Sequence, residues 1–405
     1  MMRHWRVKEL GDISSVAAGN PAPQDDEWFD EGHHPFFRTS DVGRIRVGTI
    51  HESADHLNDK GIVGLRRFPR GTILMPKSGA STFLNHRVVM GVDGFAASHL
   101  AAVVADDPQV DHRFLFHFLT TIAAQDLIQE HAYPSLKLAD IKSLRVPLPP
   151  LSEQRRIVAV LDQAFAGIEK VLVNIESNVA DARALFEGYL TDVFSRRGEG
   201  WTDKRLREVA LDFGRGKSKH RPRNDPRLFG EKYPFIQTSE VRQSNQFIRE
   251  ASKYYSDFGL SQSKLWPKGT VCITIAANIA ETGILDFDAC FPDSVIGLVV
   301  DEEKACNRFV EYALRHMKDV LQAEGKGSAQ DNINLRTFET RRFPFPPLPE
   351  QVSIADECDA IEQEVKQYIA ICAAKRERAD ELKQSMLHRA FAGKLTETDE
   401  AMTLK

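Results

Sequence analysis

One segment in the second half of the chain concentrates basic residues in a way that suits contact with a polyanion. Nine Lys and Arg residues lie between Lys204 and Arg227, against only three acidic ones. Its centre reads GRGKSKHRPR from Gly214, and the glycines suit close approach to a backbone. Cationic side chains can hold phosphates, and a bidentate Arg can recognise the edge of a base. The candidate nucleic-acid contacts here are Arg215, Lys217, Lys219, Arg221 and Arg223. A basic run can equally be no more than solvated surface.

Several catalytic templates fit the sequence only in part. The letters GKS at Gly216 belong to a phosphate-loop pattern, but Leu211 stands where its first glycine should be. Pro292-Asp293 with the later run 302–304 (Glu-Glu-Lys) loosely matches a pattern of metal-dependent nucleases, and the matching segment of the first half lacks those residues. His33-His34 is an adjacent pair without further ligands at metal spacing. We predict no catalytic site and no metal site, and keep a nuclease as the alternative from the enzyme class.

The bulk composition is that of an ordinary globular chain. Its 405 residues allow two or three domains, and the hydrophobic content of 42% is typical. The formal net charge of −5 neither indicates nor excludes nucleic acid, because binding needs only local positive potential. The five cysteines never form a CxxC pair, which favours reduced structural thiols. No window resembles a membrane helix or a signal peptide, so the expected location is cytoplasmic.

The elements that must position these side chains occur twice. PLPPLSEQRRIV from Pro147 is answered by PFPPLPEQVSIA from Pro344, and PFFRTSDV from Pro35 by PFIQTSEV from Pro234. FPRGTI, FAASHLAAVV and RFLFHFL of the first half also have counterparts in the second, at offsets between 195 and 199 residues. A period this long, present twice, indicates a duplicated domain pair rather than a solenoid.

The sequence pattern of each copy changes at its proline stretch. Before it, short β-type runs such as GTILM, LAAVVA, GTVCITI and IGLVV alternate with helical segments and turns, which predicts a mixed α/β domain. After it, a long stretch almost free of Gly and Pro predicts a long helix. The expected order is a first domain over 1–150, a helix over 151–197, a second domain over 198–347, a helix over 348–395 and a tail over 396–405.

Both predicted helices carry a heptad seam of apolar residues. The first seam is Ile157, Leu161, Ala164, Ile168, Val171, Ile175, Ala182, Leu185 and Tyr189, with Asn178 at a polar slot; the second is Ile354, Cys358, Ile361, Val365, Tyr368, Cys372, Ala379, Leu382 and Met386, with Lys375 at the matching slot. Two matching seams in one chain favour an antiparallel coiled coil between the helices, although each could instead pack only on its own domain. At about 1.5 Å per residue the first seam is roughly 48 Å long, which equals on the order of fourteen base pairs of duplex.

These features resemble the specificity subunit of Type I restriction-modification systems over nearly the whole chain. The resemblance lies in the paired Pro-Pro-Leu-x-Glu-Gln signatures, in GSAQDNINL from Gly327 and in MLHRAFAGKL from Met386. It implies a non-catalytic subunit with two target recognition domains, each reading one half of a split, non-palindromic DNA target, while the helices set the gap between the halves. The first copy departs from the pattern, with EHAYPSLKLADI where the second has EGKGSAQDNINL.

The same resemblance implies the partners of the chain. They are double-stranded DNA, two modification subunits that methylate adenine, and restriction subunits that translocate and cleave DNA. S-adenosylmethionine, ATP and Mg²⁺ would bind those partner subunits, and no cofactor is expected in this chain. The alternative hypothesis is a structural protein, a coiled-coil adaptor that does not contact DNA.

Matched motif positions extend the set of candidate DNA contacts. In the second domain they are Gln237, Thr238, Asn278, Lys326, Ser328 and Gln330; in the first they are Arg38, Thr39, Lys77, Ser78, Asn85 and Arg87. Any of these residues can equally have a structural role, and Thr39 and Thr238 could simply support a turn. Phosphate contacts and base contacts are not distinguished by the sequence, so the target bases and the spacer length stay open.

Overall fold

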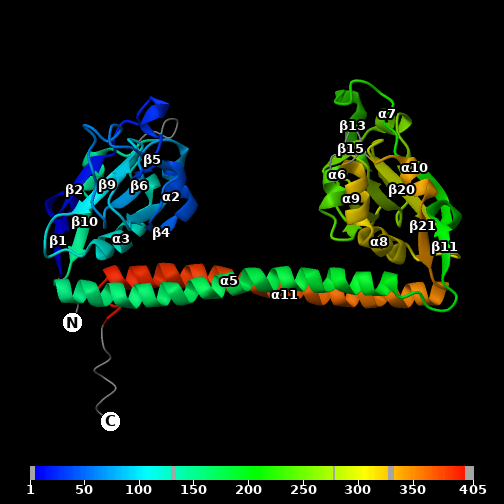
Figure 1. The fold of residues 1–405 in the computed structure, drawn as a ribbon. Helices are drawn as coiled ribbons and strands as arrows, with labels where there is room; N and C mark the ends of the chain where they lie inside the picture. Colours follow the sequence, from blue (N-terminus) through cyan, green and yellow to red (C-terminus); the bar gives the residue numbers. More distant parts are fainter. Residues whose placement is uncertain (1–4, 129–133, 277–278, 327–332, 397–405) are drawn as a thin grey trace, which may run out of the picture. The chain divides into compact units, whose positions relative to one another are not determined.

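The computed structural model describes residues 5–128, 134–276, 279–326 and 333–396 of the chain. The chain divides into two compact units, residues 1–175 with 374–405, and residues 176–373. The division falls within two long helices, α5 (Leu151–Ser195) and α11 (Leu348–Phe391), so each unit contains one end of each helix (Figure 1). Both long helices follow the proline stretches, as the sequence predicts.

The first unit is a mixed α/β domain built on a five-stranded sheet of order β2-β9-β6-β7-β4, with smaller sheets β5-β3-β8 and β1-β10. Its strands are β1 (Arg6–Glu9), β2 (Ser14–Ala18), β3 (His34–Phe37), β4 (Val47–Ile50), β5 (Asp55–Leu57), β6 (Ile73–Pro76), β7 (Arg87–Met90), β8 (Phe95–Ala96), β9 (Leu100–Ala105) and β10 (Arg145–Leu148). Its short helices are α1 (Leu10–Ile13), α2 (Thr39–Ile45), α3 (His112–Thr120) and α4 (Leu138–Lys142).

The second unit repeats this plan. Its five-stranded sheet has the order β12-β20-β17-β18-β14, beside a four-stranded sheet β15-β13-β19-β16 and the pair β11-β21. Its strands are β11 (Thr202–Arg205), β12 (Ala210–Arg215), β13 (Phe229–Phe235), β14 (Phe247–Ile248), β15 (Lys253–Tyr255), β16 (Leu265–Trp266), β17 (Val271–Thr274), β18 (Thr282–Leu285), β19 (Ala289–Cys290), β20 (Val295–Val300) and β21 (Arg342–Phe345). Its helices are α6 (Thr238–Arg242), α7 (Asp257–Ser261), α8 (Asn307–His316), α9 (Lys318–Lys326) and α10 (Leu335–Thr340).

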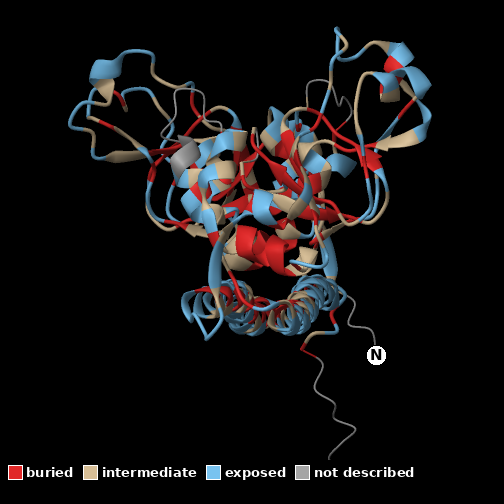
Figure 2. Ribbon diagram, turned by 90° about the vertical axis from the view of Figure 1, so that its right-hand side faces the viewer, coloured by how far each residue is buried: buried red, intermediate tan, exposed pale blue. Residues whose placement is uncertain are grey.

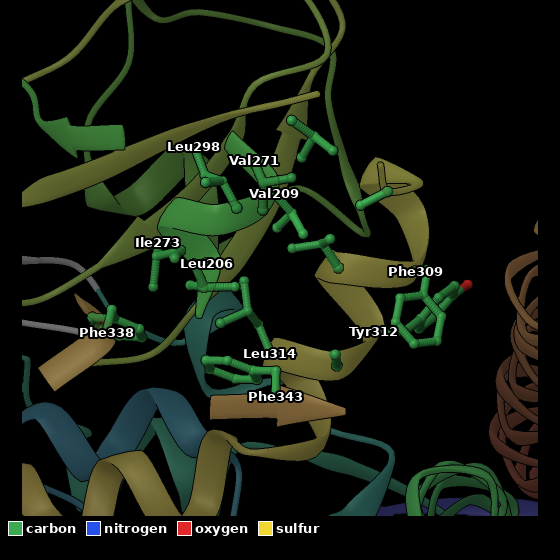
Figure 3. Close-up of a cluster of buried hydrophobic side chains, with 14 of the residues drawn as sticks. Leu206, Val209, Val271, Ile273, Leu298, Phe309, Tyr312, Leu314, Phe338 and Phe343 are labelled. Carbon is green, nitrogen blue, oxygen red and sulfur yellow. The ribbon is translucent and has the colours of Figure 1, made fainter. Parts of the chain in front are cut away.

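The β-type runs of the sequence form the centres of the two large sheets. GTILM and LAAVVA become the neighbours β6 and β9, and GTVCITI and IGLVV become the neighbours β17 and β20. In the second unit their inward side chains Val271, Ile273 and Leu298 meet Phe309 and Leu314 of α8 in one buried cluster (Figure 3). Burial of this continuous apolar surface stabilises the sheet against the helix. All five cysteines are free, and four of them are buried.

The long helices pair in an antiparallel sense within each unit. In the first unit Ile157 and Leu161, near the start of α5, share a buried cluster with Leu387, near the end of α11. In the second unit the ends are reversed, since Phe186 of late α5 clusters with Ile354 of early α11. Most of the remaining surface of both helices is exposed (Figure 2).

The structure buries or half-buries most of the predicted seam and leaves the rest exposed, on both helices. Ile157, Leu161, Ile168, Ile175, Ile354, Cys358 and Cys372 are buried, and Ala164, Ala182, Tyr189, Ile361, Val365, Ala379 and Met386 are half-buried. Four predicted seam residues are exposed instead, namely Val171 (48%), Leu185 (71%), Tyr368 (40%) and Leu382 (50%). A helix has about 3.6 residues per turn, so a strict 3.5-residue repeat drifts by about 20° per heptad. In α5 the residues that directly follow Val171, Asn178 and Leu185 are less exposed than these three, namely Leu172, Val179 and Phe186. Asn178 and Lys375, at the polar slots of the two seams, are both exposed.

The repeated glutamine of the proline signatures fixes the start of each long helix to its domain. Gln154 Oε1 accepts a hydrogen bond from the backbone N–H of Asp111 (2.9 Å), and its Nε2 donates to the carbonyls of Gln109 and Pro149. Gln351 repeats the arrangement with the N–H of Cys306 (3.0 Å) and two carbonyls. Both glutamine side chains are buried. The signature recurs because the same joint is made twice.

A second joint attaches one helix of each domain to a long helix. An aspartate on the long helix bonds an arginine and, one turn later, a polar aromatic residue. The contacts are Arg113 (3.0 Å) and His117 (2.9 Å) of α3 with Asp162 of α5, and Arg308 and Tyr312 (2.6 Å) of α8 with Asp359 of α11. Each α/β domain is therefore held to a long helix by matched polar contacts as well as by apolar packing.

A buried carboxyl beside the second joint makes the stability of the chain depend on pH. Glu311 of α8 is 1% exposed, its Oε1 accepts from Thr282 Oγ1 (2.8 Å), and burial raises the pKa of the Glu311 carboxyl to about 7. Because this pKa is raised on folding, the folded chain keeps a proton that the unfolded chain loses above its ordinary pKa. The free energy of unfolding therefore falls as the pH rises from about 4.5 to about 7.

We expect Glu311→Gln to remove this pH dependence, because the amide stays neutral. The variant should gain roughly 2 kcal/mol on the wild type between pH 5 and pH 8. Urea unfolding of the wild type and the variant at several pH values measures the difference. Parallel stability curves for the two proteins would show that Glu311 is not the group responsible.

Candidate nucleic-acid interface

The basic segment of the second unit forms a loop between β12 and β13 that is held by two carboxylates. Asp293 accepts from Arg223 through its side chain (2.9 Å) and from Arg215 through its backbone carbonyl (2.7 Å). Asp225 accepts from His220 and Arg227, each at 2.7 Å, and the hydrogen bonds from Arg227 hold the pKa of Asp225 well below its usual range. These contacts fix the two ends of the loop.

The middle of this loop presents its charges to solvent. Lys217, Lys219 and Arg221 are exposed, and within the described part of the chain none of them forms an ion pair. Arg221 donates only to the backbone carbonyls of Ser218 (2.6 Å) and His220 (2.8 Å). Positive charge that is exposed and uncompensated is what contact with a phosphate backbone requires.

The two glycines of the basic segment have different roles, and the first of them, Gly214, lies in β12. At Gly214 an added Cβ would meet nothing within 4 Å, so the backbone there is open to close approach. At Gly216 the same atom would lie 2.3 Å from the carbonyl oxygen of Phe291, so this glycine lets two segments of the chain itself come together. Gly216 is therefore a packing residue, and the prediction of close approach by DNA to the backbone stays a prediction for Gly214 alone.

Three candidates of the second domain come together around one cavity. Arg223, Gln237 and Thr238 line a space of about 490 Å³ beside β13 and β15. Gln237 immediately precedes α6, and its backbone N–H donates to Glu240 Oε2 (3.1 Å). Lys326 is the last residue of α9, whereas Asn278, Ser328 and Gln330 lie outside the described residues.

Most of the first-domain candidates make contacts within the fold of their own domain. Arg38 forms an ion pair with Asp55, and Thr39 opens α2. Ser78 Oγ lies 2.8 Å from His99 Nδ1. Lys77, which directly follows β6, is half-buried, and its backbone hydrogen-bonds on both sides. These residues can reach a ligand only at the partly exposed face of their side chains.

Two first-domain candidates are required by the fold itself. Asn85 has a left-handed backbone (φ 54°), accepts from the N–H of Ala124 (2.7 Å) and donates to Gln125 (2.9 Å). The guanidinium of Arg87 is completely buried in β7, and burial lowers its pKa to about 10. The prediction that Arg87 contacts DNA is wrong, because a side chain with no exposed surface reaches no phosphate and no base.

The residues of the nuclease-like pattern do not converge. Asp293 precedes β20, whereas Glu302, Glu303 and Lys304 follow it, so the six-residue strand separates them by roughly 20 Å. Lys304 pairs with Asp301, and Asp293 holds the basic loop. Sequence reasoning considered Asp293 only as a nuclease residue and missed its role as the anchor of that loop.

The histidine pair has a third neighbour that the sequence analysis did not identify. His33 and His34 place their Nε2 atoms 3.3 and 2.8 Å from Asp59 Oδ1, so these three side chains could hold a metal ion. At the matching place in the second unit, Lys232 and Tyr233 both donate to Asp257 (2.7 and 3.1 Å). The recurrence without histidine indicates that the aspartate is a structural tether in both units.

The comparisons with known proteins agree on one family. Residues 2–176 and 198–370 both match the family described as Type I restriction modification DNA specificity domain. The Type I restriction enzyme MjaIX specificity subunit of Methanocaldococcus jannaschii is 26% identical over 42% of this chain and 39% of its own length. The MjaVIII specificity subunit of the same organism is 22% identical over 96% of this chain and 93% of its own length. The chain spans 61% of the length of another curated relative, the putative MjaX specificity subunit of that organism, 39% of the MjaIX subunit and 93% of the MjaVIII subunit.

A solved structure extends the likeness to the fold. A chain of the structure described as "Structural basis underlying complex assembly and conformational transition of the type I R-M system" matches with a TM-score of 0.80 at 20% identity. The match covers 97% of this chain and 98% of that one. Among the described helices, none combines the length and apolarity needed to cross a membrane.

Proposed function

Since the chain belongs to the family of Type I restriction modification DNA specificity domains, we propose that it is the DNA-recognition subunit of a type I restriction-modification enzyme. It has no catalytic role of its own in this proposal. Each α/β domain reads one half of a split DNA target, and the pair of long helices sets the number of base pairs between the halves. The observation that carries the proposal is the duplication of one domain plan, with each copy joined to a different end of the same two helices.

The duplication also accounts for the proposed partners. A duplex has approximate two-fold symmetry, so one kind of reader can serve both halves of a target if it is present twice. Similar frames with different surfaces suit a target that is not a palindrome. The two repeated frames of domain and helices would offer two similar docking sites, one for each of two adenine-methylating modification subunits, and restriction subunits would complete the enzyme. S-adenosylmethionine, ATP and Mg²⁺ would bind those subunits.

The domain assignment is tested by exchanging residues 1–146 for those of a relative with a different target. Sequencing of modified adenines in host DNA, with and without the hybrid chain, reports the target that it directs. We expect one half of the target to change, while the other half and the spacer stay as in the wild type. A change of both halves together would contradict the assignment of one half to each domain.

A further inference from the structure

Three potential metal ligands of the first unit converge where β3 begins. The Nε2 atoms of His33 and His34 lie 3.3 and 2.8 Å from Asp59 Oδ1, and the three ligand atoms all lie within 4.8 Å of one another. Imidazole and carboxylate ligands lie about 2.0–2.2 Å from Zn²⁺, so two ligands of one tetrahedral ion are about 3.3 Å apart. The separations are therefore close to those that a shared ion requires. No other group of three histidine, cysteine or acidic side chains converges in this way in the described part of the chain.

The segment that carries the two histidines is fixed by its backbone. The N–H of His33 donates to the carbonyl of Leu57 (3.1 Å), and His34 pairs with Leu57 across β3 and β5. Gly32 permits this close approach, because a Cβ there would lie 2.1 Å from the carbonyl oxygen of His56. His33 lies just before the strand, so the two rings do not alternate to opposite faces as neighbours within a strand do.

The turn that carries Asp59 is fixed as well. The side chain of Asn58 accepts from the backbone N–H of Gly61 (3.0 Å) and donates to the carbonyl of Glu27 (2.8 Å). The N–H of Asn58 donates to the carbonyl of Trp28 (2.9 Å). All three potential ligands therefore lie on segments that are held in place before any ion binds, which favours a metal site of defined geometry.

The second unit shows that the fold does not need the histidines. Its matching aspartate, Asp257, accepts from Lys232 (2.7 Å) and Tyr233 (3.1 Å), and Tyr233 pairs with β15 in the register in which His34 pairs with β5. Asp257 raises the pKa of the Lys232 ammonium, and a protonated amine offers a metal no lone pair. The tether is thus common to both units, whereas the metal-binding chemistry is particular to the first.

We propose that His33, His34 and Asp59 bind one divalent transition-metal ion, with Zn²⁺ as the expected ion. Two imidazoles and a carboxylate suit zinc, whereas Mg²⁺ and Ca²⁺ prefer sites made of oxygen alone. The ion takes the lone pairs of both Nε2 atoms, so both histidines bind in the neutral form. The side chains of His33 and Asp59 are 60% and 81% exposed, so water completes the coordination. The bound ion joins β3 to the turn after β5 and stabilises the first α/β domain. This site does not depend on the proposed function.

The first test titrates Zn²⁺ into the full chain after metal removal with a chelator, followed by calorimetry. The double variant His33→Lys, His34→Tyr carries the pair of the second unit, so it keeps the tether and loses both imidazoles. We expect its affinity for zinc at this site to fall by more than about 100-fold, because loss of even an outer partner of a metal ligand costs about 10- to 100-fold. His56→Gln, in β5 and outside the group, should keep the wild-type affinity. Absence of zinc binding by the wild type, or unchanged binding in the folded double variant, would overturn the proposal.

The second test measures what the ion does to the chain. Zinc should raise the urea midpoint of the wild type and of His56→Gln, because an ion that binds only the folded state stabilises it. The double variant should unfold at the same urea concentration with and without zinc. Co²⁺ in place of zinc should give visible absorption bands in the wild type that the double variant lacks. Equal stabilisation of the wild type and the double variant by zinc would show that the ion binds elsewhere, and would overturn the proposal.

Discussion

The triple variant Lys217→Ala, Lys219→Ala, Arg221→Ala is expected to bind duplex DNA roughly 10- to 1000-fold more weakly than the wild type. These side chains are exposed, and within the described residues none of them is neutralised by a carboxylate. If each holds one phosphate, the slope of log K against log[salt] should become less steep by about 2.7, since each released counterion contributes about 0.9. Binding to unrelated duplexes should weaken as well, because phosphate contacts do not depend on sequence.

Titrations of labelled duplex between about 50 and 200 mM salt measure both quantities. Arg215 and Arg223 are left in place, because Asp293 holds both and their loss would disturb the loop. The matched control removes three exposed cations of α5 instead, through Arg155→Ala, Arg156→Ala and Lys170→Ala. If the loop variant and the control variant both keep the wild-type salt slope, the loop does not bind DNA, and the coiled-coil adaptor becomes the better explanation of the chain.

The largest effects on stability are expected from the two buried glutamines of the repeated signature. Gln154→Ala and Gln351→Ala should each lower the free energy of unfolding by about 2–4 kcal/mol. Each change deletes three hydrogen bonds and leaves a backbone N–H, of Asp111 or of Cys306, without its acceptor. A buried donor without a partner costs more than the net gain of the lost bond.

Urea unfolding followed by circular dichroism measures these losses. Arg155→Ala and Ser353→Ala change exposed neighbours on the same turns of α5 and α11, and should stay within about 0.5 kcal/mol of the wild type. Glutamine variants as stable as these controls would show that the signature recurs for another reason, such as a partner contact.

The sequence predicted the architecture well because that information is local and repeated. Alternation and β-branched residues identified strands such as β9 and β20, and the proline stretches marked the start of α5 and α11. The helix register was predicted less well. A strict heptad was extrapolated from Ile157 and Ile354, whereas a helix of about 3.6 residues per turn moves the buried face off Val171 and Leu185.

The candidate site was harder to predict because it depends on contacts between distant segments. Arginine is a residue type that often contacts DNA, but the topology places Arg87 in a buried strand. Asp293 lies 70 residues from Arg223, so no spacing rule links the two. Lys253 and Gln237 line one cavity, and only the register of β15 against β13 brings Lys253 to it.

The central claim is that the two helices together measure the distance between two independently read half-targets. The most direct test removes seven residues from α5 and the facing seven from α11, a change that rotates the remaining helix by only about 20°. The helix pair shortens by about 10 Å, equal to about three base pairs. Sequencing of modified adenines in host DNA should show both half-targets unchanged and a spacer shorter by about three base pairs. A spacer of the original length in a folded, active variant would contradict the claim.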